Sequence, residues 1–229
     1  MSKLDTTVAV IVPVYNEESV INSVVQDIAK YYKYIICVND GSKDNSSQII
    51  AQTKAILIEH PINMGQGAAL QTGIEFARQF NKIHYFATFD SDGQHKTSDL
   101  NKMVKEAKKN QYDIILGSRF LGTTIGLTKS KKAILKLAIW FTNVTSGLKL
   151  TDTHNGLRVF NRKMADEIQI TMSDMSHASE ILEIISKNKY TYKEVPVTIE
   201  YTDYSKRKGQ SLINAINIGF DTLLRKVFK

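Results

Sequence analysis

Val8-Ala-Val-Ile-Val-Pro-Val14 is a short apolar run rich in β-branched residues, and the polar stretch Tyr15-Asn-Glu-Glu18 follows it directly. Such a run is typical of a strand that is buried on both faces of a sheet. Apolar residues then recur at helical spacing, at Val20, Ile21, Val24, Val25 and Ile28. The chain therefore opens with a strand, a polar loop and a helix, which is the unit of parallel α/β sheets.

The same alternation continues through the first half of the chain. Further apolar runs predict strands at 34–38, 55–58, 85–89 and 113–116, and helix-like stretches lie between them near 44–54, 66–80 and 97–109. Strands that are apolar on both faces and separated by helices predict an α/β fold. Its central sheet should be mostly parallel, with helices on both faces.

The pattern changes after Gly122, but we expect this half to complete the same domain. We predict a helix at 131–146, a polar cluster at 151–158, a short strand, a helix at 177–188 and a strand at 194–200. A polar link then leads to an amphipathic helix from Ser211. We therefore divide the chain into one domain, residues 1–203, and a basic loop with a C-terminal amphipathic helix, residues 204–229.

Length and composition exclude several classes of protein. The 229 residues suit one large domain or one domain with an appendage, and 42% hydrophobic with 23% charged residues is typical of a globular chain. The single cysteine excludes an internal disulfide framework and a cysteine-cluster metal site, and it fits a reducing compartment. No apolar stretch approaches 18 residues and no signal core opens the chain, so we expect neither a membrane span nor export.

The net charge of +7 is concentrated in two segments. Residues 125–151 carry five lysines and no acid, and residues 202–229 carry six basic and two acidic residues. The rest of the chain is slightly acidic. Because both basic segments also contain apolar runs, they predict contact with an anionic surface, with a membrane favoured over nucleic acid.

Polar residues follow the predicted strands at the points where a parallel sheet binds its ligands. The stretches nominated by this rule are Tyr15–Glu18, Asn39–Ser42, His60–Gly67 and Asp90–His95. Asp90 and Asp92 are the sharpest feature, because a turn after a strand can bring both carboxylates to one Mg²⁺ or Mn²⁺ ion. A solvated acidic loop is the alternative.

Two further stretches at strand ends could either bind a ligand or serve only to form a turn. Asp40 can accept a hydrogen bond from the imino group of a base, or it can form an Asx turn before a helix. The glycines of Asn63-Met-Gly-Gln-Gly67 open a helix whose N–H groups could face an anion, or they serve only the turn.

The ordered set of motifs resembles the family 2 glycosyltransferases, inverting enzymes with the GT-A nucleotide-sugar fold. The stretches that carry the resemblance in the first half are Val12-Pro-Val-Tyr-Asn-Glu-Glu18, Val38-Asn-Asp-Gly-Ser42, Asn63-Met-Gly-Gln-Gly67, Asp90-Ser-Asp-Gly-Gln94 and Gly117-Ser-Arg-Phe120. The second half is similar to the branch with dolichyl-phosphate mannose synthases and polysaccharide-building transferases, through Asp152-Thr-His-Asn-Gly-Leu-Arg158, Ser179-Glu-Ile-Leu182, Glu194-Val-Pro-Val197 and Tyr204-Ser-Lys-Arg-Lys-Gly-Gln-Ser211.

The resemblance implies a donor site in residues 1–122 and an acceptor side in residues 123–203. It implies that Asp90 and Asp92 hold Mn²⁺ or Mg²⁺ and that Asp40 binds the base. The other residues that it implies for binding of the nucleotide sugar are Pro13, Tyr15, Glu17, Gly65, Gly67, Ser91, Gln94, Arg119, Arg158, Lys206 and Lys208. Asn39 departs from the family pattern, because many members have an aspartate there.

An inverting transfer to a hydroxyl group also needs a base on the opposite face of the sugar. The resemblance makes Glu180 the first candidate for this base, and Asp152 is the second candidate. A helix-surface glutamate and a loop aspartate are the alternative interpretations. A phosphate acceptor would need no base, because it is already deprotonated.

Two helices are candidates for surface contacts. The helix with Trp140 has basic flanks, which favours a position at a membrane interface over buried packing. The C-terminal helix could dock on the domain, pair with a second subunit in a homo-oligomer or lie on lipid.

The expected function is inverting, metal-dependent transfer of a sugar from a nucleotide-diphosphate sugar. The expected acceptor is a polyprenyl phosphate or a lipid-linked saccharide, and the expected location is cytoplasmic, peripheral at the inner face of the plasma membrane. The expected role is in polysaccharide or glycoconjugate biosynthesis. A nucleotidyltransferase is disfavoured because Tyr15-Asn-Glu-Glu18 stands where a glycine-rich basic loop would be needed. A basic nucleic-acid-binding module would interleave aromatic and basic residues over one face, so we expect no nucleic-acid partner.

Overall fold

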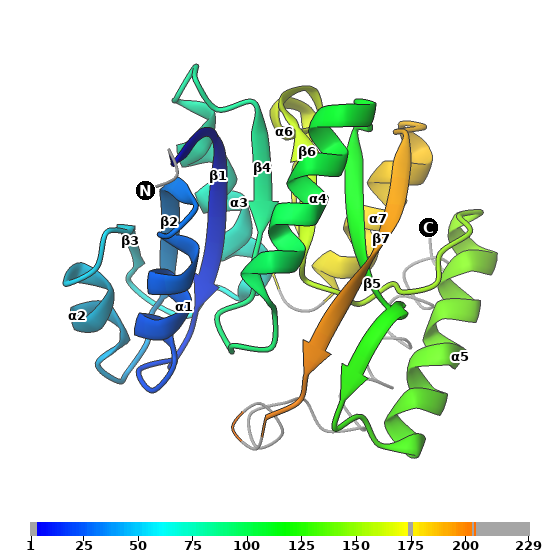
Figure 1. Cartoon of the computed structure of the whole chain (residues 1–229), viewed down its shortest axis with the longest axis horizontal. Helices are drawn as coiled ribbons and strands as arrows, with labels where there is room; N and C mark the ends of the chain where they lie inside the picture. Colours follow the sequence, from blue (N-terminus) through cyan, green and yellow to red (C-terminus); the bar gives the residue numbers. More distant parts are fainter. Residues whose placement is uncertain (1–3, 174–175, 203, 205–229) are drawn as a thin grey trace.

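The computed structural model describes residues 4–173, 176–202 and 204. These residues form one seven-stranded sheet with helices on both faces (Figure 1). The elements are β1 (Asp5–Val14), α1 (Ile21–Ile28), β2 (Tyr32–Asp40), α2 (Ser46–Ala51), β3 (Ile56–His60), α3 (Gln66–Arg78), β4 (Tyr85–Thr88), α4 (Thr97–Asn110), β5 (Ile114–Ile125), α5 (Lys129–Ser146), β6 (Arg158–Asn161), α6 (Arg162–Glu167), α7 (His177–Lys187) and β7 (Tyr192–Glu200).

The strand order is β3-β2-β1-β4-β6-β5-β7. Four strand pairings are parallel, and the two made by β6, with β4 and with β5, are antiparallel. The prediction of a mostly parallel sheet is therefore confirmed. Because β1, β2, β3 and β4 are parallel neighbours, their carboxyl ends lie together at one edge of the sheet.

Two hydrophobic clusters fill the space between the sheet and its helices. One joins α1, α2 and α4 to one face through residues such as Val10, Val25 and Met103. The other joins α3, α6 and α7 to the opposite face through residues such as Ile11, Leu70 and Ile181. Successive residues Val10 and Ile11 of β1 enter different clusters, as alternation along a strand requires.

Strand β5 is longer than the sequence indicated. We predicted a strand at 113–116, whereas β5 runs on to Ile125 with a register shift against β7 between Ser118 and Thr123. Gly122 makes the second part possible, because a Cβ there would lie 2.2 Å from the carbonyl oxygen of Val197. The motif Gly117-Ser-Arg-Phe120 thus lies within the strand.

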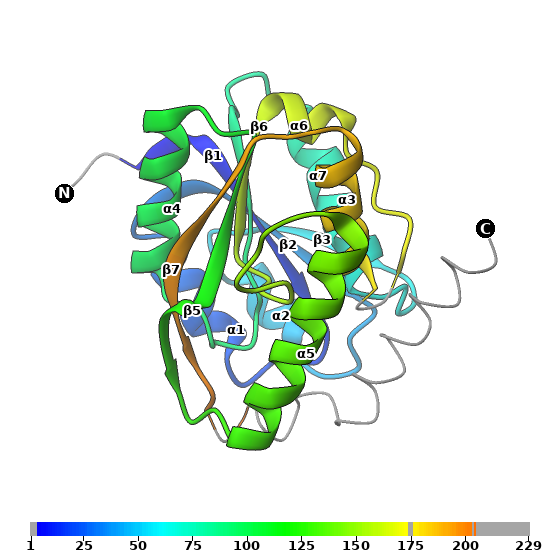
Figure 2. The same ribbon diagram turned by 90° about the vertical axis from the view of Figure 1, so that its right-hand side faces the viewer.

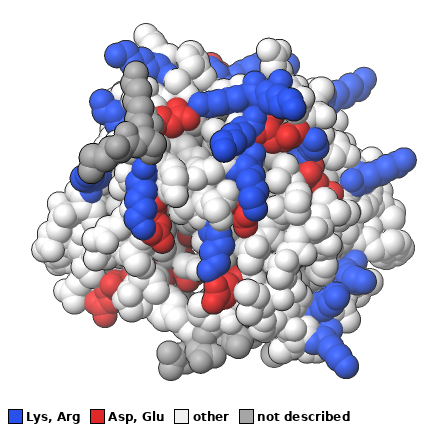
Figure 3. Space-filling model, viewed as in Figure 1, with Lys and Arg blue, Asp and Glu red and all other residues white. Residues whose placement is uncertain are grey.

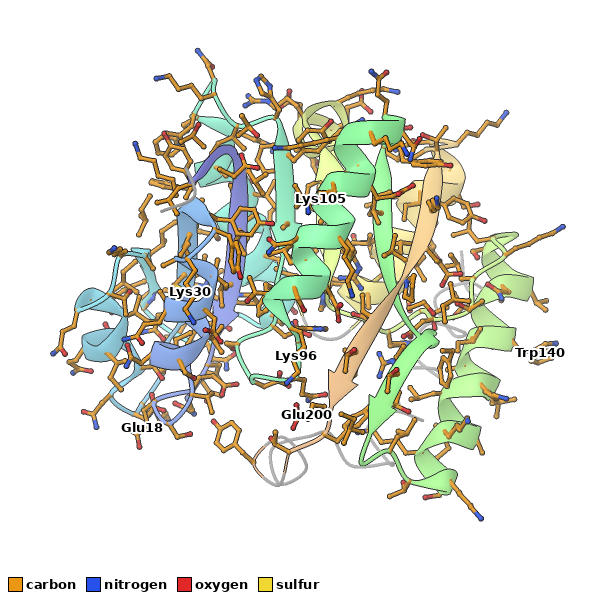
Figure 4. All side chains as sticks on the ribbon, viewed as in Figure 1. Glu18, Lys30, Lys96, Lys105, Trp140 and Glu200 are labelled. Atoms are coloured by element: carbon orange, nitrogen blue, oxygen red, sulfur yellow. The ribbon has the colours of Figure 1, made fainter. Side chains whose placement is uncertain are left out.

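Helix α5 stands at the margin of the molecule beside β5 and β7 (Figures 1 and 2). None of its residues is buried, and Leu137, Trp140 and Val144 are 65%, 62% and 66% exposed. Trp140 extends from the outer side of the helix (Figure 4). On the face covered by α1 and α4, basic side chains lie among acidic ones (Figure 3).

Within the described residues, no helix has the length and apolar character needed to cross a bilayer. The predicted basic loop and C-terminal helix, with Lys206 and Lys208, lie outside the described residues apart from Tyr204.

Candidate active site

The loop after β4 carries Asp90 at the shared carboxyl edge of the sheet. Nε2 of His95 lies 3.0 Å from Asp90 Oδ2, and Nε2 of Gln66 donates to Asp90 Oδ1 at 3.1 Å. Burial would raise the pKa of Asp90, but the His95 hydrogen bond and the charges of His95, Arg158 and His177 outweigh it and lower the pKa. Asp90 is therefore held as a carboxylate among groups that favour its charge.

Arg158 lies beside Asp90 at the start of β6 and is 2% exposed. Burial lowers the pKa of its guanidinium group, and the charges of Asp90 and Asp152 oppose that effect. Its NH1 atom is buried and has no hydrogen-bond partner among the described residues. Since a buried, unpaired cationic donor is costly, this atom indicates a place for an anionic ligand.

The surroundings of the second aspartate, Asp92, disfavour the charged form of its side chain. Burial and the neighbouring charge of Asp90 raise the pKa of Asp92. Gln94 supports it through its backbone N–H, 3.0 Å from Asp92 Oδ1, and through its side-chain amide on Oδ2. Gln94 is in turn fixed to the end of β7, because its carbonyl oxygen accepts from the N–H of Glu200, whose carboxylate pairs with Lys96 (Figure 4).

The two carboxylates fit a divalent cation. Asp90 and Asp92 are hard oxygen donors whose mutual repulsion a cation would relieve, and such sites commonly keep waters and substrate phosphates as further ligands. No group of three or more histidine, cysteine, aspartate or glutamate side chains with metal-binding geometry occurs in the described part of the chain. The donor set therefore suits Mg²⁺ or Mn²⁺ bound together with a diphosphate.

A cavity of about 660 Å³ opens at the carboxyl ends of β1, β2 and β3. It is lined by Tyr15, Asn39, Gly41, Ser42, Lys43, Asp44, Ser47, Gln48, Glu59, His60, Pro61, Ile62 and Asn63. The wall thus contains parts of three stretches that the sequence nominated, and Tyr15 is the one residue of the predicted nucleotide-sugar set among its described lining residues. Asp40 is not among the described residues that line it.

The carboxylate of Asp40 is occupied by its own fold. Its Oδ1 atom accepts from the N–H of Met64 at 2.9 Å and lies 2.7 Å from His60 Nδ1, and its Oδ2 atom accepts from the N–H of Gly65 at 2.7 Å. His60 Nε2 lies 2.9 Å from the hydroxyl of Thr72 in α3. Asp40 therefore ties the end of β2 to the start of α3.

The amides of Gly65 and Gly67 are also engaged. Gly65 has a φ of +94°, the left-handed region that favours glycine, and its N–H is the one held by Asp40. The N–H of Gly67 donates to the carbonyl oxygen of Ser173 at 2.6 Å, and a Cβ on Gly67 would lie 1.9 Å from the carbonyl oxygen of Met172. These glycines bring the 171–173 segment against α3.

Two separate contacts hold the remaining nominated residues near β1. The hydroxyl of Ser91 donates to the carbonyl oxygen of Pro13 at 2.8 Å, which fixes the Asp90–Asp92 loop to the end of β1. Glu17 is 5% exposed and its Oε2 atom accepts from the hydroxyl of Tyr204 at 2.7 Å. Tyr204 thus lies against the loop after β1.

Arg119 and Asp152 form a buried ion pair. Nε of Arg119 lies 2.6 Å from Asp152 Oδ2, and the two side chains are 8% and 1% exposed. The guanidinium also donates to the hydroxyl of Tyr201 and to the carbonyl oxygen of His154. Both predicted site residues are therefore bound mainly to each other.

Lys131 is a basic residue near the carboxylates that sequence reasoning did not single out. It is half-buried in the first turn of α5, with its Nζ atom 4.7 Å from the centre of the Tyr201 ring. Burial and the charge of Arg119 lower the pKa of Lys131, while the charge of Asp92 raises it. The sequence predicted this helix, but it did not predict that the first turn of the helix lies near the carboxylates at the edge of the sheet.

Glu180 holds the segment that precedes α7. Its two carboxylate oxygens accept from the N–H and hydroxyl groups of Thr171 and from the N–H of Met172, at 2.5–3.0 Å. This is the segment that also packs against Gly67.

Three polar contacts of the site came from residues that lie in the nominated stretches but outside the predicted set of binding residues. His60, Gln66 and His95 each contact a nominated aspartate across 5 to 24 residues of chain. The only sequence signal for them was their place in the stretches that follow β3 and β4.

Comparison with known proteins identifies the family. A family profile described as glycosyl transferase family 2 matches residues 9–169. An uncharacterised protein of Methanocaldococcus jannaschii is 34% identical over 224 residues, which covers 96% of this chain and 92% of that protein. The UDP-N-acetylglucosamine–dolichyl-phosphate N-acetylglucosaminyltransferase of Methanococcus voltae is 32% identical over 250 residues, 98% of each chain.

Among solved structures, glucosyl-3-phosphoglycerate synthase from Mycobacterium tuberculosis, in complex with Mn²⁺ and UDP-glucose, has the same fold. The TM-score is 0.71 at 14% identity, over 95% of this chain and 77% of that one. The expected GT-A fold is thereby confirmed. By its profile match and its relatives, the chain belongs to glycosyl transferase family 2.

Proposed function

We propose that this chain transfers a sugar, with inversion, from a nucleoside-diphosphate sugar to a lipid-linked phosphate. The observation that carries the proposal is the Asp90–Asp92 loop, where Arg158 acts on the charge of Asp90 and has a buried, unpaired NH1 atom, at the edge that also bears the cavity. A pair of carboxylates suits a cation, and an unpaired buried guanidinium suits an anion. A metal-bound diphosphate supplies both.

The donor fits across the ends of four neighbouring strands, β3, β2, β1 and β4. Its nucleoside occupies the cavity at β2 and β3, which Tyr15 lines, and its diphosphate crosses the end of β1 near Glu17 to reach Asp90 and Asp92. Strands lie about 4.8 Å apart, so the path from β2 to β4 is roughly 10 Å. Pro13, Gly65, Gly67, Ser91 and Gln94 support this path by fixing its loops.

A divalent cation, Mn²⁺ or Mg²⁺, would be held by Asp90 and Asp92. When bound it supplies positive charge to the departing nucleoside diphosphate. The chain itself adds Arg158 and Lys131 near the same carboxylates. Lys206 and Lys208, outside the described residues, remain proposed phosphate contacts. Fixed positive groups of this kind stabilise charge as it develops in the transition state.

A phosphate acceptor explains why both predicted bases are already occupied. Glu180 accepts hydrogen bonds from Thr171 and Met172, and Asp152 is paired with Arg119. A phosphate monoester, with a second pKa near 6, needs no base at neutral pH. We assign Glu180 and Asp152 positioning roles and favour a polyprenyl phosphate over a lipid-linked saccharide. The relative from Methanococcus voltae is named for transfer to dolichyl phosphate.

Helix α5 is the element that we propose to lie on the membrane. Leu137, Trp140 and Val144 share one exposed face, and Lys132 and Lys136 are exposed beside it. A half-apolar helix with basic flanks suits an anionic bilayer surface. Contact with the bilayer would let the chain reach a lipid-linked acceptor at the cytoplasmic face of the plasma membrane, for assembly of a glycoconjugate or polysaccharide. Pairing with a second copy through this face is the competing outcome.

The test supplies the purified chain with Mn²⁺, a panel of radiolabelled nucleotide sugars and two matched acceptors. One is a polyprenyl phosphate in detergent micelles, and the other is the corresponding polyprenol. We expect label to enter the lipid phase only with the phosphate. Transfer to polyprenol at a similar rate would contradict the phosphate assignment, and lack of transfer from any donor to either lipid would contradict the proposed function.

A further inference from the structure

The carboxyl group of Asp90 occupies the space that a side chain at position 156 would fill. A Cβ atom added to Gly156 would lie 2.1 Å from Asp90 Oδ2, 2.3 Å from Oδ1 and 2.4 Å from Cγ, which are its three nearest neighbours. Atoms that are not bonded to each other do not approach this closely. The Asp90 carboxyl group therefore packs directly against the backbone of Gly156.

The backbone conformation of Gly156 does not itself require glycine. Its φ lies outside the left-handed region that Gly41 and Gly147 adopt. At Gly41 and Gly122 an added Cβ would meet the backbone of another segment, whereas at Gly156 it would meet the end of one side chain. The need for glycine at position 156 therefore comes from the Asp90 carboxyl group.

Hydrogen bonds fix the segment that carries Gly156. Near its start, Thr151 donates its N–H and its hydroxyl to the carboxylate of Glu194 at 2.9 Å. The carbonyl oxygen of Gly156 accepts from the hydroxyl of Thr88 at 2.6 Å. Because Thr88 ends β4 and Asp90 lies two residues further on, this bond holds Gly156 beside the loop that carries Asp90.

Two side chains contact the same carboxyl group. Nε2 of Gln66 donates to Asp90 Oδ1 at 3.1 Å, and Nε2 of His95 lies 3.0 Å from Oδ2. A carboxylate oxygen accepts about two hydrogen bonds, so each oxygen keeps capacity for a cation. Displacement of the carboxyl group would break both contacts. Gln66, His95 and Gly156 therefore define one position for it.

We propose that Gly156 is a positioning residue for metal binding, whose bare backbone lets the Asp90 carboxylate take the orientation in which it holds the divalent cation. The inference rests on the proposed function, since it takes Asp90 as a metal ligand. Segment 152–158 then acts on the cation twice, because it supplies both Gly156 and Arg158, whose charge acts on Asp90. A displacement of this segment would change the metal site.

The first test compares Mn²⁺ binding by the wild-type chain and by Gly156→Ala. Mn²⁺ is titrated into the whole chain with UDP, dTDP or GDP, and the electron paramagnetic resonance signal of the free ion is read against the same nucleotide without protein. With the nucleotide that the wild-type chain binds best, Gly156→Ala should bind Mn²⁺ at least about tenfold more weakly. Loss of a group that orients a metal ligand commonly costs about 10–100-fold in metal affinity.

Gly147→Ala is the matched control, because it is the same substitution at a place where a Cβ would meet nothing within 4 Å. Gly147 ends α5 with a φ of +73°, so this variant should have a lower melting temperature through backbone strain. Its affinity for Mn²⁺ should equal that of the wild-type chain. The control separates a loss of stability from a displacement of Asp90.

The second test measures the contact itself, in EDTA. Gly156→Ala should lower the melting temperature by at least about 2 °C, because the added methyl group crowds the Asp90 carboxyl group. Asp90→Ala removes the three crowded atoms. In that background the same change at Gly156 should lower the melting temperature by less than about half as much.

Mn²⁺ binding by a folded Gly156→Ala chain as tight as that of the wild-type chain would overturn the assignment. An equal fall in melting temperature with and without the Asp90 carboxyl group would overturn it as well. If Gly156→Ala does not fold, Thr88→Val replaces it, because it frees the Gly156 carbonyl group; unchanged Mn²⁺ affinity would then contradict the assignment. If the wild-type chain bound no Mn²⁺ with any of the three nucleotides, the proposed function would fall first, and the assignment with it.

Discussion

The Asp152 carboxylate and the Arg119 guanidinium form an ion pair that joins the segment before β6 to the middle of β5, across 33 residues of chain. At 2.6 Å, with side chains 1% and 8% exposed, the pair is removed from solvent. Asp152 Oδ2 also accepts from the backbone N–H of Arg119 at 3.0 Å. The pair therefore fixes the segment before β6 to the backbone of β5.

Asp152→Ala should lower the free energy of unfolding by about 3–5 kcal/mol, because it leaves the Arg119 charge buried without its partner. The double variant Asp152→Ala/Arg119→Met should lose less than the sum of the two single losses. Urea denaturation of the wild-type chain, the two single variants and the double variant gives the coupling free energy between Asp152 and Arg119. Asp27→Ala, which removes an exposed pair with Lys30, is the control and should cost under about 1 kcal/mol. Additive losses at Asp152 and Arg119 would contradict the structural role of the pair.

Glu180→Gln should reduce kcat by less than about tenfold and leave the pH–rate profile in place. Glutamine keeps one acceptor for the 171–172 segment, whereas loss of a general base typically costs a hundredfold or more. Glu183→Gln, on the same helix, is the matched control. A loss above about a hundredfold together with loss of the rising limb of the profile would identify Glu180 as the base.

Leu137→Gln/Trp140→Gln should weaken binding to anionic phospholipid vesicles at least about tenfold, because two exposed apolar side chains lose their insertion energy. Cosedimentation measures the effect. Tyr31→Gln removes a 45% exposed aromatic ring away from α5 and should not change binding. Unaltered vesicle binding by the double variant, with loss of a concentration-dependent dimer, would show that this face contacts a second copy.

Asp113→Asn should destabilise the chain in a pH-dependent manner. Burial alone would raise the pKa of Asp113, but hydrogen bonds from Thr191 and Asn161 and the charge of Lys163 lower it below its ordinary 3.8. The stabilisation is therefore present above about pH 4 and is lost as the pH falls through the lowered value. We expect a deficit of about 1–2 kcal/mol at pH 7 that narrows below pH 4, measured by urea unfolding. A loss of unfolding free energy that does not change with pH would contradict this role of the Asp113 carboxylate.

Much of the fold was predictable because its signals are local. Apolar periodicity and polar strand ends identified β1 to β4 with their helices, and the parallel order then placed Asp90 and Tyr15 at one edge. The antiparallel insertion of β6 and the second part of β5 were not predictable in the same way. They depend on contacts such as Gly122 against Val197, which are 75 residues apart.

The candidate site was predictable by residue type but not by role. The resemblance nominated Asp40 and Glu180, with Asp152 as a second candidate base, yet each carboxylate is occupied by backbone N–H groups or an arginine. These partners come from 8 to 33 residues away, and no spacing rule gives their geometry. The exposure of Trp140 on α5 agrees with the prediction from its basic flanks, which favoured a surface position over buried packing.

The central claim is that Asp90 and Asp92 bind the cation that activates a nucleotide-sugar donor, and Asp92→Asn tests it most directly. Asparagine preserves the shape of the loop but removes the charge. Mn²⁺-dependent transfer of labelled sugar to polyprenyl phosphate should fall at least about a hundredfold, while the melting temperature in EDTA stays at or above that of the wild-type chain, because burial beside Asp90 disfavours the Asp92 charge. Full Mn²⁺-dependent transfer by a folded Asp92→Asn chain would contradict the account.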